Sequence, residues 1–400
     1  MKASGSPGRT GLALCCSALL WGCALPHEMV PISPCGPGAE SREIRWYGPS
    51  EPRDRVSNEE RCRTAGPPVV MESPTAPFKP LNPGDGLAVF SWNMAVGGGD
   101  LRSFLEEEVG LTCLGPETRP SDAFPDFVLL LQEAFRRSED LPPLDDPRLT
   151  ARKSVHDPHP GGDPDVLEVA ALCGLAALYV PSGRNGIDAP GERRLDKGNA
   201  ILSTLPLYDF IAVENPFETE RKVAVAASVQ LPNPAALRLV SAHMEVTSTL
   251  HRVLLSGNQT RARQAAGLIE ALDAHEREEG RRPPTLVGGD FNTWSGGESA
   301  LKLMRLAFPD SPAWDGQATR GPFPTDQIFF RRGSDGPDSA GELITLVTDS
   351  YRPVLRRYSS DHQARFIGLM IVGETMGTRR RSVRPAISDG FLPTGGGAPR

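Results

Sequence analysis

Short apolar runs separated by turn residues fill the middle of this chain, from Asp85 to Val372. Apolar runs of roughly four to eight residues bounded by turn residues predict β-strands. The predicted strands are Leu87–Met94, Asp126–Glu133, Leu175–Pro181, Asn199–Leu207, Lys222–Leu231, Leu237–Met244, Thr285–Asn292, Asp326–Arg331, Ile344–Thr348 and Ala364–Val372. The segments between them contain three helix candidates, at Leu101–Val109, Thr260–Glu279 and Ser299–Ala307.

Ten strands are more than one twisted sheet usually holds. A stretch of 288 residues with many strands and a few long helices therefore predicts an α/β fold in which two packed sheets are covered by helices.

The ends of the chain have a different pattern. Lys2 and Arg9 precede an apolar run from Gly11 to Leu20, which has the length of a secretory signal and is too short to cross a bilayer. The run ends in Leu20-Trp21-Gly22-Cys23, which resembles a bacterial lipobox except at Trp21. We expect residues 1–22 to be a signal peptide and Cys23 to carry a lipid. An ordinary cleaved signal and an apolar segment that is never removed are the alternatives.

Proline is concentrated after this segment, with 12 of the 39 prolines between Ala24 and Gly84 and no sustained helical or strand period. Residues 23–84 are therefore predicted to be a Pro-rich tether, because such a segment buries too little surface to offset its ordering entropy. Residues 373–400 are predicted to be a disordered basic tail. The domain between them covers residues 85–372.

Composition and cysteine content narrow the class of protein. The 400 residues are 39% hydrophobic and 23% charged, which excludes a wholly disordered chain, and no apolar stretch is long enough for a multi-pass membrane protein. If Cys23 is acylated and the signal is removed, four cysteines remain: Cys35, Cys62, Cys113 and Cys173. Four cysteines allow three disulfide pairings, and free thiols are the other possibility.

Polar side chains stand at the ends of the predicted strands or just before them. They are Asn93, Glu133, His243, Asp290, Asn292, Asp326, Asp361 and His362. Strands aim their terminal side chains accurately, so this placement suits a preorganised site. A single carboxylate or histidine at a strand end is usually structural, and only the set as a whole favours chemistry.

The set has the parts that hydrolysis of a phosphate ester requires. The oxygen ligands of Asn93, Glu133 and Asp361 suit Mg²⁺ or Mn²⁺, and neither thiolates nor paired histidines select zinc. Asp290 and Asn292 are two residues apart, so on an extended strand they project to the same side and could hold one water between them. Two histidines supply charge stabilisation and proton transfer.

Short motifs in a characteristic order accompany these residues. They are Trp92-Asn93-Met94, Leu131-Gln132-Glu133, Gly198-Asn199-Ala200-Ile201-Leu202-Ser203, Ser241-Ala242-His243, Gly289-Asp290-Phe291-Asn292, Thr325-Asp326-Gln327-Ile328-Phe329 and Ser360-Asp361-His362. With these motifs the chain resembles a bacterial member of the endonuclease/exonuclease/phosphatase superfamily over residues 86–372. The resemblance implies a four-layered α/β sandwich and Mg²⁺-dependent hydrolysis of phosphomonoesters or phosphodiesters.

The resemblance also implies residue roles. Glu133 is the main metal ligand, with Asn93 and Asp361 close to the metal or the bound phosphate. Asp290 orients or deprotonates the attacking water, and Asn292 fixes that water or the phosphate.

The same resemblance pairs Asp326 with His362, so that the charged imidazole faces the charge that develops on phosphorus. His243 contacts another phosphate oxygen or helps to protonate the leaving group. Asn199 is a weaker candidate for substrate binding, and Lys197 and Arg221 are expected to be solvated surface residues.

Charge bears on the substrate. Residues 85–372 contain 29 basic and 40 acidic residues, a net charge of −11, which does not favour nonspecific binding of nucleic acid. A DNA-repair enzyme is also disfavoured, because Ala95 stands where many abasic-site endonucleases of the superfamily have an acidic residue. The expected substrate is a phosphate ester outside the cytoplasm: a phospholipid headgroup, a sugar or inositol phosphate, or nucleic acid. An exported nuclease and a non-catalytic envelope lipoprotein are the alternatives.

Overall fold

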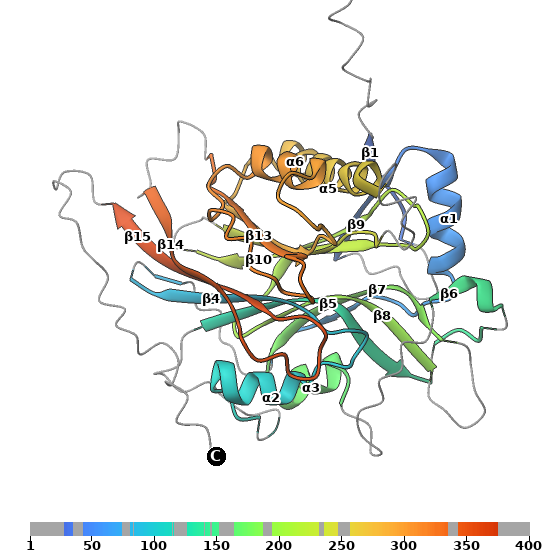
Figure 1. The fold of residues 1–400 in the computed structure, drawn as a ribbon, viewed down its shortest axis with the longest axis horizontal. Helices are drawn as coiled ribbons and strands as arrows, with labels where there is room; N and C mark the ends of the chain where they lie inside the picture. The colour runs from blue at the N-terminus through green and yellow to red at the C-terminus, as the bar shows by residue number, and fades with distance from the viewer. Residues whose placement is uncertain are drawn as a thin grey trace, which may run out of the picture.

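Two β-sheets packed face to face, with helices on both outer sides, form the body of the protein in the computed structural model (Figure 1). The structure describes residues 28–34, 43–73, 81–82, 84–113, 115, 126–139, 141–144, 146–151, 164–186, 194–231, 236–246, 257–334 and 343–374. The predicted signal peptide, Cys23, Cys35 and nearly all of the predicted basic tail lie outside these residues. None of the helices within these ranges is long and apolar enough to span a bilayer.

The first sheet has seven strands. In spatial order they are β1 (Met29–Pro31), β2 (Ile44–Pro49), β9 (Tyr208–Glu214), β10 (Val223–Gln230), β11 (Ala236–His243), β12 (Thr285–Asp290) and β13 (Asp326–Arg331). The pairs β2–β9 and β11–β12 are parallel and the other neighbours are antiparallel, so the sheet is mixed.

The second sheet has eight strands and is also mixed. In spatial order they are β14 (Leu343–Pro353), β15 (Arg365–Glu374), β4 (Gly86–Asn93), β5 (Asp126–Ser138), β8 (Arg194–Ser203), β7 (Ala176–Asn185) and β3 (Val69–Met71), with the short β6 (Thr150–Ala151) paired to β7.

Alternate residues of both sheets point into the space between them. Val89, Leu130 and Ile201 of the eight-stranded sheet meet Leu239 and Ile328 of the seven-stranded sheet in one buried cluster. Full burial of such a side chain contributes about 1.5–3 kcal/mol. The two sheets are therefore held together by the strand residues that the period of two directs inward.

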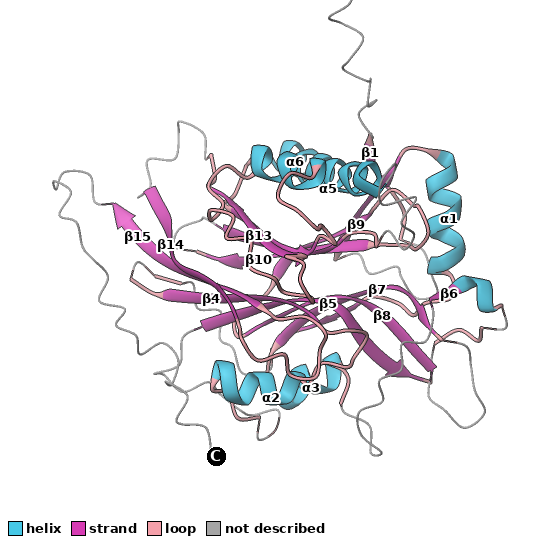
Figure 2. Cartoon of the chain, viewed as in Figure 1, coloured by secondary structure: helices cyan, strands magenta, loops and turns pink. Residues whose placement is uncertain are grey.

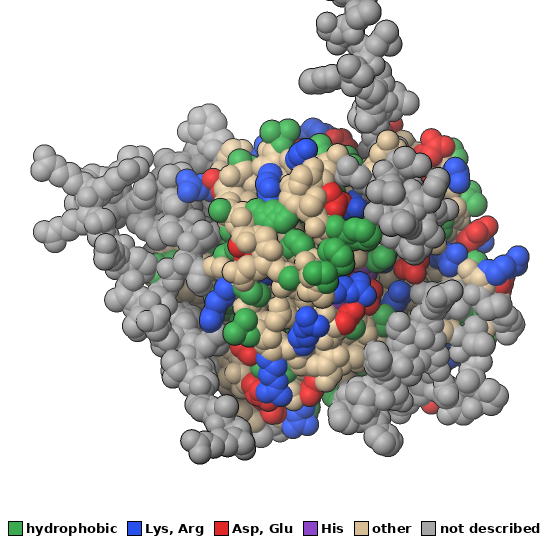
Figure 3. Space-filling model, viewed as in Figure 1, with side chains coloured by type: hydrophobic (Ala, Val, Ile, Leu, Met, Phe, Trp, Pro, Cys, Tyr) green, Lys and Arg blue, Asp and Glu red, His purple; other side chains and the backbone are tan. Residues whose placement is uncertain are grey.

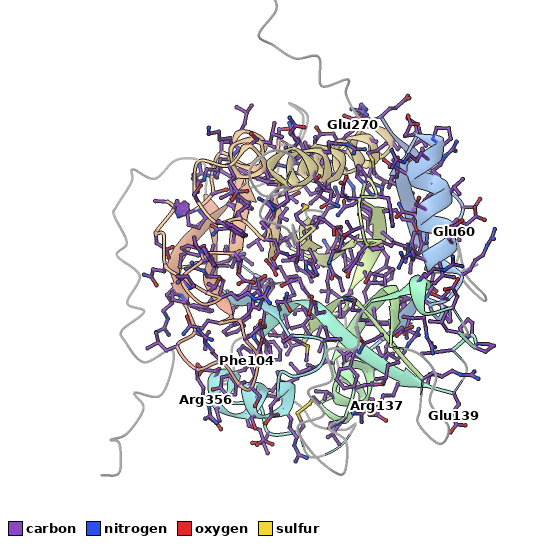
Figure 4. All side chains as sticks on the ribbon, turned by 45° about the vertical axis from the view of Figure 1, so that its right-hand side comes forward. Glu60, Phe104, Arg137, Glu139, Glu270 and Arg356 are labelled. Atoms are coloured by element: carbon purple, nitrogen blue, oxygen red, sulfur yellow. A yellow bond between two sulfur atoms is a disulfide. The ribbon has the colours of Figure 1, made fainter. Side chains whose placement is uncertain are left out.

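Helices cover the outer face of each sheet (Figure 2). α2 (Leu101–Phe104), the π-helical turn Leu105–Val109 and α3 (Val166–Leu172) lie on the eight-stranded sheet, and α5 (Gly257–Glu279) and α6 (Ser299–Ala307) lie on the seven-stranded sheet. α1 (Pro52–Cys62) stands at the side of the two sheets, against β2 and β7, and the 3₁₀ turn Pro147–Leu149 precedes β6. Phe104 of α2, labelled in Figure 4, stacks on Trp92 with ring centroids 5.0 Å apart, and Val169 of α3 joins the same cluster. On the other outer face, Leu268 of α5 and Met304 of α6 pack on the seven-stranded sheet.

This arrangement of helices, sheet, sheet and helices confirms the predicted four-layered α/β sandwich. Each predicted strand overlaps an observed one, and the predicted helix Ser299–Ala307 has the observed bounds. The strand predicted at Asn199–Leu207 is displaced, because β8 begins at Arg194 and ends at Ser203. The first half of β8 contains Asp196, which is buried and paired with Arg136. This half of the strand therefore lacks the apolar pattern that predicts a strand.

The tether prediction is wrong for the described part of residues 23–84. Three of its segments form β1, β2 and β3, and α1 lies between them. β1 and β3 have three residues each, too few to show a period, and β2 is a single six-residue strand that ends in Gly48-Pro49. The helix is anchored by polar contacts: Asn58 Nδ2 donates to Asn215 O at 3.1 Å, and Asp54 pairs with Arg263 at 3.0 Å.

The cysteines of the described residues are oxidised. Cys113 and Cys173 form a disulfide that joins the segment after the π-helical turn to the end of α3, and Cys62 is disulfide-bonded as well. The alternative of free thiols is therefore wrong for these three residues.

Candidate active site

Three adjacent strands of the seven-stranded sheet have terminal polar residues that are direct partners in the strand register: β11 and β12 end with such a residue, and β13 begins with one. His243 on β11 pairs with Asp290 on β12, and Asp290 pairs with Asp326 on β13. Gly289 makes the close approach of β11 and β12 possible, because a Cβ at this position would lie 2.0 Å from the carbonyl oxygen of Ala242. The register therefore brings together three residues that are 83 positions apart at most in the chain.

A buried histidine completes this row. Nδ1 of His362 lies 2.8 Å from Oδ2 of Asp326, the pair that the sequence predicted, and its Nε2 faces Oδ2 of Asp290 at 3.7 Å. Burial by itself lowers the pKa of His362, but the charges of Asp326 and Asp290 outweigh burial and raise the pKa to about 9. His362 is therefore charged at neutral pH.

The loop that carries His362 is tied to the other sheet. Ser360 Oγ donates to the carbonyl oxygen of Asn93 at 2.7 Å and accepts from the backbone N–H of His362 at 3.0 Å. Thr325 Oγ1 donates to Asp326 at 3.0 Å. These contacts fix the orientation of the Asp326–His362 pair.

Asp290 is the buried carboxylate at the centre of the row. It accepts from Asn93 Nδ2 at 2.9 Å and from the backbone N–H of Asn292 at 2.8 Å. Burial raises the pKa of Asp290 to about 6, and the charged His362 opposes this rise. A carboxylate with a pKa of this kind can accept a proton from water near neutral pH.

Glu133 reaches the site through a bulge in β5. Leu131 and Ala134 are three residues apart, so in a regular strand their side chains would point to opposite faces of the sheet. Both are nevertheless buried in the cluster that contains Phe104 of α2 and Val169 of α3, and the register with β8 shifts between them. The extra residue changes the direction of the strand, and Glu133 has a positive φ of 52°. Its Oε1 lies 3.9 Å from Nε2 of His243.

His243 lies beside a lysine that the sequence analysis did not include. Nζ of Lys222 is 3.4 Å from Nε2 of His243, and Oδ2 of Asp290 is 3.9 Å from the same nitrogen. Burial and the charge of Lys222 hold the pKa of His243 well below 6.5. His243 is therefore a neutral imidazole, and the cation on this side of the site is Lys222.

Asp361 is the most exposed of the predicted site residues, with 46% of its side chain accessible. It pairs with Arg320 at 2.8 Å, and its other carboxylate oxygen lies 3.7 Å from Nε2 of His362. Arg320 also forms a backbone bridge with His362. This ion pair lies at the solvent side of the dyad.

Two predicted residues occupy other positions than expected. Asn292 lies beyond the end of β12 with a positive φ of 48°, and its Nδ2 donates to Met244 O at 3.0 Å. It is joined to Asp290 by a turn. The expectation that both residues lie on one extended strand and project to the same side is therefore wrong. Asn199 is buried, and its Nδ2 donates to Ser241 O at 3.1 Å, which links β8 to β11.

The residues present fit a hard divalent cation. Carboxylates of Glu133 and Asp290 both face Nε2 of His243, and Asp326 Oδ1 is buried with no hydrogen-bond partner among the described residues. Ligand atoms of Asp290, Asp326 and His362 also lie within 4.8 Å of one another. A ligand role for His362 Nδ1 would break its hydrogen bond to Asp326.

Four basic residues were missed or misjudged from the sequence. Lys222 and Arg320 stand at a strand start and in an irregular loop, where no pattern marks them. Lys197 and Arg221 are not solvated surface residues: the exposed fractions of their side chains are 11% and 1%. The one available signal was the position of Lys197 beside the Gly198-Asn199 motif.

Comparison with known proteins gives a family match. The model of the "Endonuclease/Exonuclease/phosphatase family" matches residues 90–362, which include the motifs from Phe90 to His362. No curated protein matches the chain.

Solved structures with a similar fold are distant in sequence. An endonuclease/exonuclease/phosphatase from Beutenbergia cavernae is 15% identical with a TM-score of 0.45, and the match covers 72% of each chain. The human Nocturnin catalytic domain is 16% identical with a TM-score of 0.42, over 74% of this chain and 97% of that one. Sphingomyelinase C from Streptomyces griseocarneus is 15% identical with a TM-score of 0.38, over 71% and 99%.

Proposed function

The chain belongs to the endonuclease/exonuclease/phosphatase family, and on this basis we propose that it is a metal-dependent hydrolase that uses Asp290 to activate water against a phosphate ester. The family comprises hydrolases of phosphate esters, which fits the acidic and cationic groups of the site. The observation that carries the proposal is the row His243, Asp290, Asp326 with His362 placed against it.

The reaction follows from the charges of this row. Asp290 takes a proton from water as the water oxygen forms a bond to phosphorus, and the bond from phosphorus to the leaving oxygen breaks. The charged His362 faces the negative charge that grows on the phosphoryl oxygens, and Asp326 keeps that charge in place. Nε2 of neutral His243 accepts from the Lys222 ammonium, so Lys222 supplies the positive charge on this side of the phosphate.

Glu133, with Asn93 and Asp361, would hold the cation. When bound, Mg²⁺ neutralises charge on the phosphate and stabilises the leaving oxygen. Oδ1 of Asn93 accepts from the backbone N–H of Ala95 at 2.9 Å, which fixes the orientation of the Asn93 side chain. The ion pair with Arg320 holds Asp361 at the solvent side of the site. These contacts support a site that is arranged before substrate arrives.

Export and the substrate are part of the same proposal. The Cys113–Cys173 disulfide supports an oxidising compartment, in agreement with the signal and the lipid-bearing Cys23 expected from the sequence. We propose an extracytoplasmic substrate drawn from phospholipid headgroups, sugar or inositol phosphates and nucleic acids. Mn²⁺ would be able to replace Mg²⁺ at the oxygen ligands.

A hydrolysis assay tests the proposed function. The purified chain should hydrolyse bis(p-nitrophenyl) phosphate or p-nitrophenyl phosphate with Mg²⁺, lose the activity in EDTA and regain it when Mg²⁺ is added. Glu133→Ala should abolish the activity, whereas Glu59→Gln, a change at an exposed residue of α1, should not alter it.

The result also decides between the enzyme and a non-catalytic envelope lipoprotein. Metal-independent hydrolysis, or wild-type rates in Glu133→Ala, would refute the metal site. The absence of hydrolysis on both esters and on plasmid DNA, sphingomyelin and phosphatidylinositol phosphates would favour the non-catalytic protein.

A further inference from the structure

A hollow with basic walls lies beside the candidate active site, where β7 and β8 meet the start of β10. We call it the basic hollow; it is lined by Arg61, Arg184, Lys197, Glu220 and Arg221 among others, and has a volume of about 260 Å³ that includes space open to solvent. Four of these five residues are basic. The basic hollow therefore suits an anionic group of the substrate.

Two lysines meet the carboxylate of Glu220 at the inner end of the basic hollow. Nζ of Lys197 and Nζ of Lys222 lie 3.5 Å and 3.3 Å from the same Oε2 of Glu220. Because both lysines act on it, with Lys222 the stronger, the pKa of Glu220 falls to about 2. The side chain of Lys197 is 11% exposed and lines the basic hollow, whereas that of Lys222 is 5% exposed and also faces the charges of Glu245 and Glu133. Of the two lysines, Lys197 is therefore the one that an anion in the basic hollow would meet.

The arginine in the wall has a different role. Arg221 pairs with the buried Glu214 and donates from Nη1 to Pro181 O at 2.8 Å. Its charge is therefore matched within the protein, and it fixes the bend of β7 at this point. Lys197, by contrast, shares the carboxylate of Glu220 with Lys222.

Lys222 joins the basic hollow to the candidate active site. Its Nζ is 3.4 Å from Nε2 of His243, and the same nitrogen is 3.9 Å from Asp290. Lys197, Glu220, Lys222 and His243 thus form one continuous line of contacts.

One wall of the basic hollow is left open by a glycine. The register of β7 with β8 shifts between Pro181 and Gly183, and a Cβ built on Gly183 meets no atom within 4 Å. Gly198 on the facing strand is tightly packed, because its Cβ would lie 2.1 Å from Val180 O. The space is therefore specific to position 183.

We propose that the basic hollow binds a second phosphate group of the substrate while the first is hydrolysed between Asp290 and His362. Lysine and arginine donors suit phosphate oxygens, and a cationic hollow is unusual in a chain whose net charge is −7. Figure 3 shows Lys and Arg side chains grouped near the middle of one face, beside an apolar area. The preferred substrate carries two phosphate groups, and this preference rests on the proposed function.

Binding of non-hydrolysable probes tests the second site without turnover. Alkyl phosphonates and alkane bisphosphonates of graded length are titrated into the full chain with Mg²⁺ by calorimetry. We expect the best-fitting bisphosphonate to bind at least about tenfold more tightly than the monophosphonate of equal length. A ratio near one at every length would overturn the proposal.

Two substitutions at one glycine give a matched pair. Gly183→Asp places a carboxylate in the basic hollow and should remove the advantage of the bisphosphonate, whereas Gly183→Ala should keep it. If Gly183→Asp does not fold, Arg61→Gln should lower the advantage severalfold, and Arg277→Gln on the exposed face of α5 should leave it unchanged. An undiminished advantage in Gly183→Asp or Arg61→Gln would refute the site.

Two further arms identify the source of the phosphate and separate the two proposals. Inositol bisphosphate and a nucleoside 3′,5′-bisphosphate represent polyol and nucleic-acid substrates, and the tighter ligand assigns the class. Hydrolysis of bis(p-nitrophenyl) phosphate is measured in parallel. Bisphosphonate preference without hydrolysis would refute only the proposed function, and hydrolysis without preference would refute only the second phosphate site.

Discussion

Among the residues that the structure describes, two buried histidines are hydrogen-bonded to aspartates, and one of these pairs belongs to the candidate active site. His362 Nδ1 is 2.8 Å from Asp326, and His275 Nε2 is 3.0 Å from Asp209. Both histidines are almost completely inaccessible to solvent. The pairs themselves are therefore nearly alike, and the difference lies in what surrounds them.

The groups around His275 are matched to one another. Its Nδ1 contacts the hydroxyl of Tyr47 at 3.2 Å, and Oδ2 of Asp209 accepts from Arg238 at 3.1 Å. Arg238 also pairs with Glu276, which in turn pairs with Arg331. Every charged group in this cluster has an opposite charge beside it, so the cluster holds α5 against the sheet.

The second nitrogen of His362 has no such partner at hydrogen-bond distance among the described residues. It faces Asp290 and Asp361 at 3.7 Å each. Two residues of the site, Glu133 and Asn292, also have positive φ angles. An Asp–His pair therefore indicates a reactive site only when the second ring nitrogen of the histidine is left for a ligand.

The largest effect should come from Asp290→Asn. We expect kcat to fall by about 10² to 10⁴, because the amide cannot accept the proton of the attacking water. The melting temperature should change by no more than about 4 °C, because the side chain keeps its size. Steady-state kinetics and calorimetry measure the two quantities, with Asp310→Asn as a control outside the site. A variant that unfolds instead of losing activity would make Asp290 a structural residue.

Glu276→Gln should give the opposite result in the other cluster. The buried guanidinium groups of Arg238 and Arg331 would lose their shared carboxylate, at a cost of about 3–5 kcal/mol in the free energy of unfolding. The kcat of the folded fraction should remain within about twofold of wild type. Urea titration measures the loss, and Glu270→Gln at the exposed pair with Arg277 should cost less than about 1 kcal/mol. Equal losses in the two variants would end the distinction between matched and exposed charges.

The Asp326–His362 pair should respond as a unit. Asp326→Asn keeps the size of the side chain but removes the charge that maintains the imidazolium, so kcat should fall about 30-fold to 1000-fold, or 2–4 kcal/mol of transition-state stabilisation. Mg²⁺ affinity should change little. The double variant with His362→Ala should be hardly slower than His362→Ala alone. Fully additive losses would show that the two residues act independently.

Much of the fold was predictable because its strands follow a simple period. Residues such as Val89 and Leu130 alternate with neighbours that face outward, so the apolar pattern of the sequence identifies the residues of the core between the sheets. The helix α1 was not predictable in this way, because Asn58 and Asp54 hold it by contacts with residues more than 150 positions away. The helix α3 had a local signal that went unused, the capping box of Asp165 and Glu168.

The acidic residues and histidines that the structure brings together could be named from the sequence, but the basic residues beside them and the neutral state of His243 could not. The motifs mark Asp290, Asp326 and His362, but the neutral state of His243 depends on Lys222, which only the register of β10 and β11 brings beside it. The bulge at Glu133 likewise depends on pairing with β8. Protonation states and strand irregularities depend on tertiary contacts, which a short sequence motif does not specify.

The smallest effect should be a pH-dependent loss of stability in Asp209→Asn. Burial raises the pKa of Asp209, but the contact with His275 and the charge of Arg238 outweigh burial and hold the pKa below its ordinary 3.8. The carboxylate therefore stabilises the folded state above pH 3.8, and this contribution is lost as the pH falls through the lowered value. At pH 7 the variant should be less stable by about 1–2 kcal/mol, since a hydrogen bond to a charged group contributes roughly 1.5–3 kcal/mol and the amide keeps one acceptor.

Urea titrations of wild type and Asp209→Asn from pH 7 to acid measure this contribution. The difference in the free energy of unfolding should stay constant down to the ordinary pKa of 3.8 and shrink below it, while kcat at pH 7 remains that of wild type. A difference that persists unchanged in strong acid would mean that Asp209 contributes through packing and not through its charge. A loss of activity at pH 7 would mean that the two Asp–His pairs are coupled through the seven-stranded sheet, and the separation between a structural and a reactive pair would fail.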